Sequence, residues 1–333
     1  MPRPLVLFWA APHRTALLDE RLSEFCDTAL LSDCNLDDRR RAAALIASST
    51  GVNKAIGAET FAQLPNLSVV ASRGAGANCF DLDAATAYGL PVLNNPGVAP
   101  DAVVEYVLAT LPLVYRHLVE ESRALEKGSE LRQLRPQLAG KTVAVLGMGA
   151  IGRLVAARVQ AAYDVAVTTW RPRRRPDVPA GVRVVGSLEE LLAGCDALVV
   201  TLPLTDETTA MIGEHELSLL KPSAVVVNVS RGGIVDETAL AARIAAGRLG
   251  GAAVDVFATE PVPADNPLLG LPNVFATPHC AGIATEARAR LDSATADGVL
   301  CALAGVRPKR IANGVWPPRR RPAGFAYPVP APA

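Results

Sequence analysis

The chain has 333 residues, half of them hydrophobic and 5% aromatic, and its 33 Lys and Arg balance its 33 Asp and Glu. This length accommodates two domains with sizeable cores, and the balanced charge gives no reason to expect a nucleic acid or a membrane surface as partner. Six scattered cysteines without a C-x-x-C pair are typical of reduced thiols in a cytoplasmic protein: Cys26, Cys34, Cys79, Cys195, Cys280 and Cys301.

The first hundred residues alternate strand and helix patterns. The apolar run at residues 4–10 fits a buried strand better than a signal peptide, and no stretch reaches the length of a transmembrane helix. Further strands are expected at 67–72 and 91–93, and helical segments at 14–25, 59–64 and 82–88. The polar segment 37–41 runs into AAALIAS at 42–48, where the pattern does not separate helix from strand. The alternation predicts a small parallel sheet covered on both faces.

A long apolar helix is expected from 101 to about 127, with Pro112 inside it as a kink or a break. The alternation then restarts and predicts a doubly wound parallel sheet, whose ligands bind at the carboxyl ends of the strands. Its expected strands are 142–146, 164–170, 182–185, 197–202, 224–229, 251–256 and 273–276. Its expected helices are 151–162, 188–193, 207–219 and 237–246, followed by a last helix at 285–304.

A glycine turn lies between the first strand of this second sheet and its first helix. The sequence KTVAVLGMGAIG ends in Gly147, Gly149 and Gly152, and a helical pattern follows at once. The first glycine permits a sharp turn, the second permits close approach of a pyrophosphate, and the third permits tight helix–strand packing. Strand, G-x-G-x-x-G and helix in this order predict a dinucleotide site.

Three chemically distinct side chains follow three later strands of the same sheet. They are Arg231 after 224–229, Glu260 after 251–256 and His279 after 273–276. An arginine can bind a carboxylate bidentately, a histidine exchanges a proton near neutral pH, and a carboxylate beside it favours its charged form. The three types suit hydride exchange between a nicotinamide and a 2-hydroxy or 2-keto acid.

The chain resembles the D-isomer-specific 2-hydroxyacid dehydrogenases from about residue 67 to about residue 286. The resemblance rests on an ordered set of motifs: SRGAGANCFDLDAA, GLPVLNNPG, GMGAIG, VNVSRGGIVDETAL, AAVDVFATEP and TPHCAG. It implies that Arg231 binds the substrate carboxylate and polarises the keto oxygen, that His279 is the acid–base group, and that Glu260 is its partner. It also implies an oxidoreductase that transfers a hydride between NAD(P)H and a small 2-keto or D-2-hydroxy acid such as glyoxylate or hydroxypyruvate.

The resemblance implies a domain organisation as well. A Rossmann dinucleotide-binding domain at 100–284 is inserted into a flavodoxin-like substrate domain, made of 1–99 and 285–316, with the active site in the cleft between them. The family further implies a homodimer. The Pro- and Arg-rich residues 317–333 contain few core-forming residues and are expected to be disordered.

The resemblance extends to residues that contact cofactor and substrate. The substrate carboxylate is expected at Arg73, Gly74, Ala75, Gly76, Arg231 and His279. The cofactor is expected at Gly147, Gly149, Ala150, Ile151, Gly152, Arg171, Arg173, Pro203, Thr208, Val229, Ser230, Arg231, Asp255, His279 and Gly282, with Asp255 on the nicotinamide carboxamide. No cluster has the spacing of metal ligands.

The second strand of the Rossmann unit departs from the NAD-using pattern. NAD-using members place an acidic residue at its end for the ribose hydroxyls, whereas this strand is followed by Arg171-Pro172-Arg173-Arg174-Arg175. Arginine pairs with a 2′-phosphate and an acidic side chain repels it. The sequence therefore predicts a preference for NADPH, with Arg171 as leading contact and Arg173 or Arg174 next, against the alternative of a solvated basic loop.

The substrate itself stays open at this point. Asn78-Cys79 replaces the Asp-Asn common in the family, in a loop that shapes substrate preference. D-3-phosphoglycerate dehydrogenase and a phosphonate- or phosphite-type dehydrogenase remain alternatives, and formate dehydrogenase is less favoured because its members have glutamine at the Glu260 position. A dinucleotide-sensing corepressor is the alternative from another class of protein.

Overall fold

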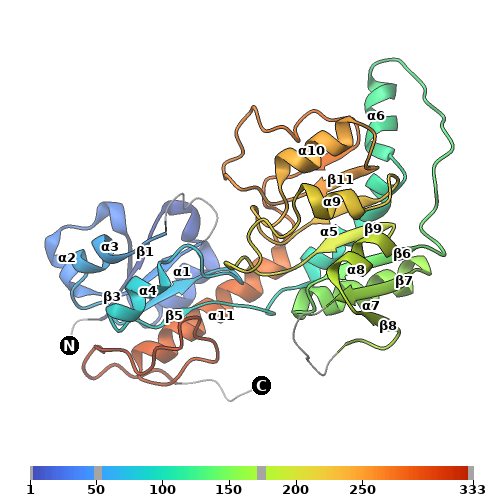
Figure 1. Ribbon diagram of the computed structural model, residues 1–333. Helices are drawn as coiled ribbons and strands as arrows, with labels where there is room; N and C mark the ends of the chain where they lie inside the picture. Colours follow the sequence, from blue (N-terminus) through green and yellow to red (C-terminus); the bar gives the residue numbers. More distant parts are fainter. Residues whose placement is uncertain (1–2, 49–54, 171–177, 329–333) are drawn as a thin grey trace. The chain divides into compact units, whose positions relative to one another are not determined.

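The computed structural model describes residues 3–48, 55–170 and 178–328. The chain forms two compact units, residues 1–99 with 285–333 and residues 100–284 (Figure 1). Each unit is an α/β domain built on a parallel sheet, as the alternation predicts.

The first unit has a five-stranded sheet in the order β2-β1-β3-β4-β5, which is the flavodoxin-like order. Every pair is parallel. The strands are β1 (Leu5–Phe8), β2 (Asp27–Leu30), β3 (Ala42–Ala47), β4 (Val69–Ser72) and β5 (Val92–Leu93). The edge strand β2 was not expected, because its half-exposed DTAL sequence lacks the apolar run of the buried strands.

The polar segment 37–41 lies in a helix, and the ambiguous run after it forms a strand. α2 (Leu36–Arg41) begins with a capping box in which the Asn35 side chain accepts from the Asp38 amide and Asp38 accepts from Asn35. The fully buried β3 follows directly. The polar cap and the apolar run are thus two elements, although hydrophobic periodicity alone could not separate them.

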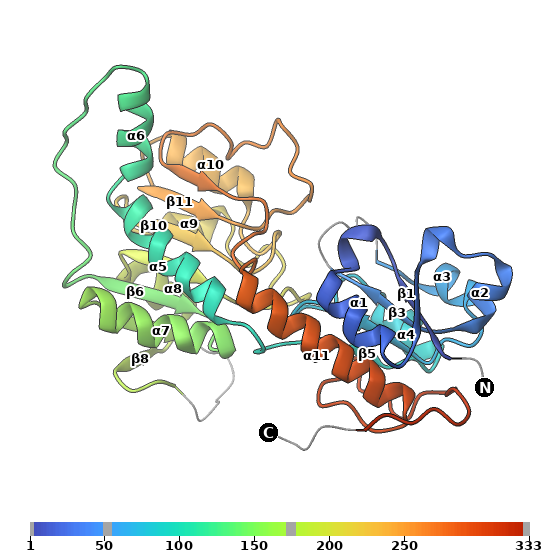
Figure 2. The same ribbon diagram turned by 180° about the vertical axis from the view of Figure 1, so that it is seen from behind.

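Helices cover both faces of the first sheet. α1 (Ala16–Ser23) and α11 (Thr285–Leu303) share a core with one face and lie in front of it in Figure 2. α3 (Ala58–Gln63) and α4 (Leu82–Ala87) contribute to the core on the other face. The last helix therefore completes the domain that the first hundred residues begin.

Residues 317–328, the described part of the tail expected to be disordered, contact the core of the first unit. Their backbone is irregular, but the Tyr327 ring meets Phe25 edge-on at 5.1 Å between centroids, and its hydroxyl donates to Asp297 over 3.1 Å. Phe325 and Tyr327 both pack against the core between α1 and α11. Two aromatic side chains bury enough surface to hold a short segment that cannot fold by itself.

The second unit has a seven-stranded sheet in the order β12-β11-β10-β9-β6-β7-β8. All pairs are parallel. This is the Rossmann order 3-2-1-4-5-6 with a seventh strand, and the order reverses between β6 and β9. The strands are β6 (Thr142–Leu146), β7 (Ala166–Trp170), β8 (Val182–Val185), β9 (Ala197–Val200), β10 (Val225–Asn228), β11 (Gly251–Val254) and β12 (Val274–Ala276).

Helices again lie on both faces of this sheet. α5 (Asp101–Tyr115) and α7 (Ala150–Tyr163) share a core with one face (Figure 2). α8 (Leu188–Gly194), α9 (Glu214–Leu219) and α10 (Glu237–Ala245) cover the other face (Figure 1). The helix expected at 207–219 begins only at Glu214, because Thr208 closes a turn on Thr205 and Ala210 has φ 53°.

The helix expected at 101–127 is broken, but not at Pro112. α5 continues to Tyr115, and α6 (Leu118–Glu126) follows at an angle of 68°. Pro112 lies in the last turn of α5. Proline has no amide hydrogen to donate to the Leu108 carbonyl four residues earlier, and that carbonyl accepts instead from the Tyr163 hydroxyl. The break falls at His117, which has φ 55°. Within the described ranges, no single helix is long and apolar enough to cross a membrane.

Candidate active site

The glycine turn joins β6 to α7 in the second unit. Gly147 has φ +108°, and an added Cβ would stand 2.9 Å from the Leu202 amide nitrogen. A Cβ on Gly152 would lie 1.9 Å from the Gly147 carbonyl oxygen, whereas one on Gly149 would meet nothing within 4 Å. Packing thus demands the first and third glycines, and the second borders open space.

The amino terminus of α7 fits an anionic ligand. Its N-cap is the exposed Gly149, no side chain caps it, and its first turn carries no acidic residue. The first amides of a helix need acceptors, and the helix dipole favours a negative charge beside them. Open space at Gly149 and uncapped amides from Ala150 onward suit the pyrophosphate of a dinucleotide.

The three predicted chemical groups follow three adjacent strands. Arg231 comes three residues after β10, Glu260 lies in the loop after β11, and His279 lies just after β12. A Glu260 carboxylate oxygen lies 2.8 Å from His279 Nδ1, and its other oxygen accepts from the Phe257 amide at 3.1 Å. The Nδ1 atom of the imidazole is therefore engaged by a carboxylate, and Nε2 is the nitrogen that can interact with a substrate.

Glu260 and Arg231 also interact electrostatically. Burial raises the pKa of Glu260, but hydrogen bonds from His279 and the Phe257 amide, with the charges of His279 and Arg231, lower it below its ordinary value overall. Burial lowers the pKa of the Arg231 guanidinium, and the Glu260 charge partly opposes this. Arg231 donates to the Ser230 carbonyl at 2.6 Å. The cluster thus pairs an ionised carboxylate with two basic side chains.

Asp255 organises the loop that carries His279. This carboxylate is 2% exposed and accepts hydrogen bonds from the Thr277 hydroxyl (2.6 Å) and the amides of Cys280 (2.8 Å) and Ala281 (2.9 Å). The Asp255 carbonyl also accepts from the His279 amide over 2.8 Å. These bonds hold His279 at φ 53°, a left-handed conformation that non-glycine residues adopt only when their surroundings impose it.

Tyr106 and Thr277 belong to this network and were missed in the sequence. The Tyr106 hydroxyl on α5 lies 2.7 Å from the Thr277 hydroxyl, which contacts Asp255. No local pattern joins residues 106 and 277, so only the packing of α5 against the sheet could have found the pair. The Asp255 carboxylate already accepts from Thr277, Cys280 and Ala281. Its expected contact with the nicotinamide carboxamide remains a prediction.

Several other expected cofactor residues lie in loops after the strands. The Ser230 hydroxyl donates to the Leu202 carbonyl, which ties the loops after β10 and β9 together. The Thr208 hydroxyl, buried at 8% exposure, donates to the Pro203 carbonyl at 2.7 Å and closes that turn. These two side chains shape the loops, and their cofactor contacts remain predictions, as do those of Ile151, Val229 and Gly282.

The glycine-rich loop predicted to bind the carboxylate follows β4 in the first unit. Ser72 donates to the Gly76 carbonyl at 2.6 Å, and Asn94 donates to the Ala75 carbonyl at 2.8 Å. In the described part of the chain, the amides of Ala75 and Gly76 donate to no other residue. A held loop with two unused amides is consistent with the predicted carboxylate contact.

Arg73, also expected at the substrate carboxylate, has a buried side chain. Its side chain is 1% exposed and donates to Asp292 at 2.8 Å and to the carbonyls of Pro12 and His13 at 3.1 and 3.2 Å. A buried guanidinium needs such partners to offset its desolvation. Arg73 therefore joins β4 to α11 through Nε and Nη1, its Nη2 has no hydrogen-bond partner among the described residues, and the substrate contact predicted for it remains a prediction.

Arg171 and Arg173, the residues expected to select the cofactor, lie outside the described residues. Among the described residues, no group of three or more His, Cys, Asp or Glu could hold a metal ion. The six cysteines, which all lie in the described residues, form no disulfide bond.

Known proteins are similar to this chain over most of its length. Residues 108–281 match the family model described as D-isomer specific 2-hydroxyacid dehydrogenase, NAD binding domain. A glyoxylate reductase of Korarchaeum cryptofilum is 35% identical over 278 residues, which cover 81% of this chain and 83% of that protein. A D-3-phosphoglycerate dehydrogenase of Mycobacterium leprae is 39% identical over 79% of this chain, which spans about half (49%) of that relative's length.

A solved structure extends the similarity over both units. The NADPH-dependent glyoxylate/hydroxypyruvate reductase of Sinorhizobium meliloti, in complex with NADP and malonate, superposes with a TM-score of 0.83 at 28% identity. The match covers 96% of this chain and 99% of that one. With the matched family model and the ordered motifs, this makes the chain a member of the D-isomer specific 2-hydroxyacid dehydrogenase family.

Proposed function

We propose that this chain is a dehydrogenase that reduces small 2-keto acids, such as glyoxylate or hydroxypyruvate, to D-2-hydroxy acids and prefers NADPH. The observation that carries the proposal is the 2.8 Å contact between His279 and Glu260, with Arg231 close enough to lower the pKa of that carboxyl group. All three follow strands of the sheet that also carries the glycine turn.

Each residue of the cluster has a chemical task in this reaction. Arg231 binds the carboxylate of the keto acid and favours negative charge on the keto oxygen. His279 delivers a proton to that oxygen from Nε2, while Glu260 orients the ring through Nδ1. The uncapped end of α7 and Gly149 would hold the dinucleotide, whose nicotinamide supplies the hydride when bound.

The preference for NADPH rests on sequence and similarity. β7 ends at Trp170, and Arg171, Arg173, Arg174 and Arg175 follow before the first acidic residue, Asp177. A guanidinium favours a 2′-phosphate, and the absence of a carboxylate at the strand end removes the repulsion that NAD-specific enzymes use. The similar Sinorhizobium meliloti reductase is described as NADPH-dependent.

The experiment is to measure kcat/KM with NADPH and NADH on glyoxylate, hydroxypyruvate, pyruvate and 3-phosphohydroxypyruvate. We expect turnover of the small keto acids, with kcat/KM at least about tenfold higher for NADPH, since one lost charge-assisted contact is worth that factor. Arg171→Ala should reduce the ratio about tenfold. Arg183→Ala, which removes an exposed arginine paired with Glu190, is the matched control and should leave the ratio unchanged.

Three results would contradict parts of this proposal. Best turnover of 3-phosphohydroxypyruvate would favour the activity named for the Mycobacterium leprae relative. An NADH preference unaltered by Arg171→Ala would refute the cofactor assignment. Dinucleotide binding without turnover of any keto acid would favour the alternative of a dinucleotide-sensing binding protein.

Glu260→Gln should lower kcat about ten- to a hundredfold and change the pH dependence. The lowered pKa of Glu260 keeps its carboxylate charged through the neutral range, where it accepts the hydrogen bond from His279 Nδ1 and orients the ring. Because the pKa is lowered in the folded protein, this contact should be lost only as the pH falls into the acidic range, so the parent enzyme should show an acidic limb in kcat that Glu260→Gln lacks. An acidic limb that is the same in both enzymes would show that it does not come from Glu260.

A further inference from the structure

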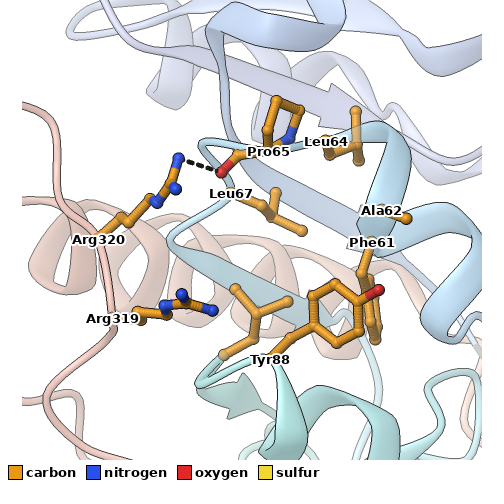
Figure 3. Close-up of a pocket in the computed structure, with 9 residues that line it drawn as sticks. Phe61, Ala62, Leu64, Pro65, Leu67, Tyr88, Arg319 and Arg320 are labelled. Atoms are coloured by element: carbon orange, nitrogen blue, oxygen red, sulfur yellow. Dashed lines mark hydrogen bonds between the residues drawn. The ribbon is translucent and has the colours of Figure 1, made fainter.

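The first unit contains a pocket that the proposed reaction does not use. It has a volume of about 220 Å³ and lies between residues 319–320 on one side and α3, the residues before β4 and those after α4 on the other (Figure 3). Its lining comes from α3 and the turn after it, from Leu67 before β4, from Tyr88 and Leu90 after α4, and from Arg319 and Arg320. All of these belong to one unit, so the pocket does not depend on how the two units are arranged.

One end of the pocket is apolar and aromatic. The rings of Phe61 and Tyr88 meet edge-to-face at 5.7 Å between centroids with an interplanar angle of 62°. Leu64, Leu67 and Leu90 continue this wall and are nearly fully buried. Such a wall accepts a ring or a short aliphatic body, because apolar contact there removes surface from water.

The other end of the pocket is cationic. Arg320 is anchored, because its guanidinium donates to the Pro65 carbonyl at 2.6 Å and to the Asn66 side-chain oxygen at 2.7 Å. Arg319 is fixed through its backbone amide, which donates to the Gly89 carbonyl at 3.1 Å, and Figure 3 shows its guanidinium directed into the pocket. Within the described residues, that guanidinium has no hydrogen-bond or ion-pair partner.

Charge complementarity indicates the kind of ligand. No acidic residue lines the pocket, and Arg320 also lines a neighbouring depression with Arg3, Arg40, Arg41 and Arg321. The electrostatic potential around the pocket is therefore positive. Salt bridges to Asp27, Asp37 and Asp38 partly offset the charges of the arginines in the neighbouring depression. A free guanidinium fork matches a carboxylate. At roughly 30 Å³ for each water molecule, 220 Å³ holds about seven waters or a ligand of about ten heavy atoms.

We propose that this pocket binds a small carboxylate with an apolar body, its carboxylate on Arg319 and its body against Phe61 and Tyr88. The occupied pocket would fasten residues 319–320 to α3 and α4, because the ligand contacts both sides. This gives the C-terminal segment a ligand-binding role in addition to its packing against the core.

The test is calorimetric titration of the full chain with 3-phenylpropionate and with its neutral amide. The carboxylate should bind measurably and the amide at least about tenfold more weakly, since one charge-assisted contact is worth that factor. Arg319→Gln should weaken carboxylate binding by about tenfold or more. Arg321→Gln removes the same charge two residues away, outside the pocket lining, and should leave the affinity unchanged.

Arg231→Gln separates this pocket from the proposed catalytic site, which would also accept a carboxylate. The pocket predicts that one binding event persists in Arg231→Gln and is lost in Arg319→Gln. Three results would refute the pocket: binding that is lost only in Arg231→Gln, equal weakening by Arg319→Gln and Arg321→Gln, or no binding at all. None of these results would affect the proposal of keto-acid turnover, which is measured separately.

A measurement on the unmodified chain covers the case in which Arg319→Gln misfolds. Trypsin cleavage after Arg319 and Arg320, identified by the mass of the fragments, should slow at saturating 3-phenylpropionate and not with the amide. Cleavage at an unchanged rate would overturn the proposal.

Discussion

Replacing His279 should lower kcat for keto-acid reduction by about 10²- to 10⁴-fold, the usual contribution of general acid–base catalysis. His279 has φ 53°, a conformation that asparagine tolerates better than alanine does. His279→Asn therefore removes the proton donor with the least disturbance of the backbone, and His279→Ala adds the cost of strain. We expect both variants to lose kcat and to bind NADPH almost as the parent does, as measured by steady-state kinetics and fluorescence titration.

The comparison of the two variants separates chemistry from folding. If the loss comes from the missing acid, His279→Asn should retain the melting temperature of the parent and lose activity as fully as His279→Ala. If activity instead followed melting temperature across the two variants, the role of His279 would be structural. A His279→Asn enzyme with more than a tenth of the parent kcat would refute its assignment as the proton donor.

Arg231→Gln should lower kcat/KM by about 10²- to 10³-fold. The guanidinium is the cation of the cluster beside Glu260, and a bidentate carboxylate contact contains two charge-assisted hydrogen bonds. We expect KM for the keto acid to rise and kcat to fall as well, because the same charge favours the developing negative charge on the keto oxygen. Affinity for NADPH, measured without substrate, should change little.

A lysine at position 231 separates the effect of the positive charge from that of the planar guanidinium. Arg231→Lys keeps the charge without the planar fork, and it should recover only part of the loss. Arg248→Gln, at an exposed position in the same unit, is the matched control and should behave as the parent enzyme. If Arg231→Gln raised the KM for NADPH and not that for the keto acid, the carboxylate assignment would be wrong.

Most of the fold could be predicted from local pattern, because buried parallel strands are short apolar runs and the helices between them show their own periodicity. The elements that were missed or given wrong bounds are places where a tertiary contact or a side-chain hydrogen bond overrides the local sequence pattern. β2 is half-exposed and carries little apolar signal. The helix expected at 207–219 starts late because the Thr208 hydroxyl closes a turn before it. The first helix of the second unit ends beyond Pro112, since the Tyr163 hydroxyl supplies the donor that proline removes.

The sequence by itself determined the glycine turn and which side chains follow β10, β11 and β12, because both depend on neighbours along the chain. Only the tertiary structure decided which groups meet. It joined Glu260 to His279, linked Tyr106 to Asp255 through Thr277, and buried Arg73 against Asp292. It also packed Tyr327 on Phe25 where the composition predicted disorder. Residues this far apart along the chain come together only through packing, and burial then selects the hydrogen-bond and ion-pair partners that each polar group must have.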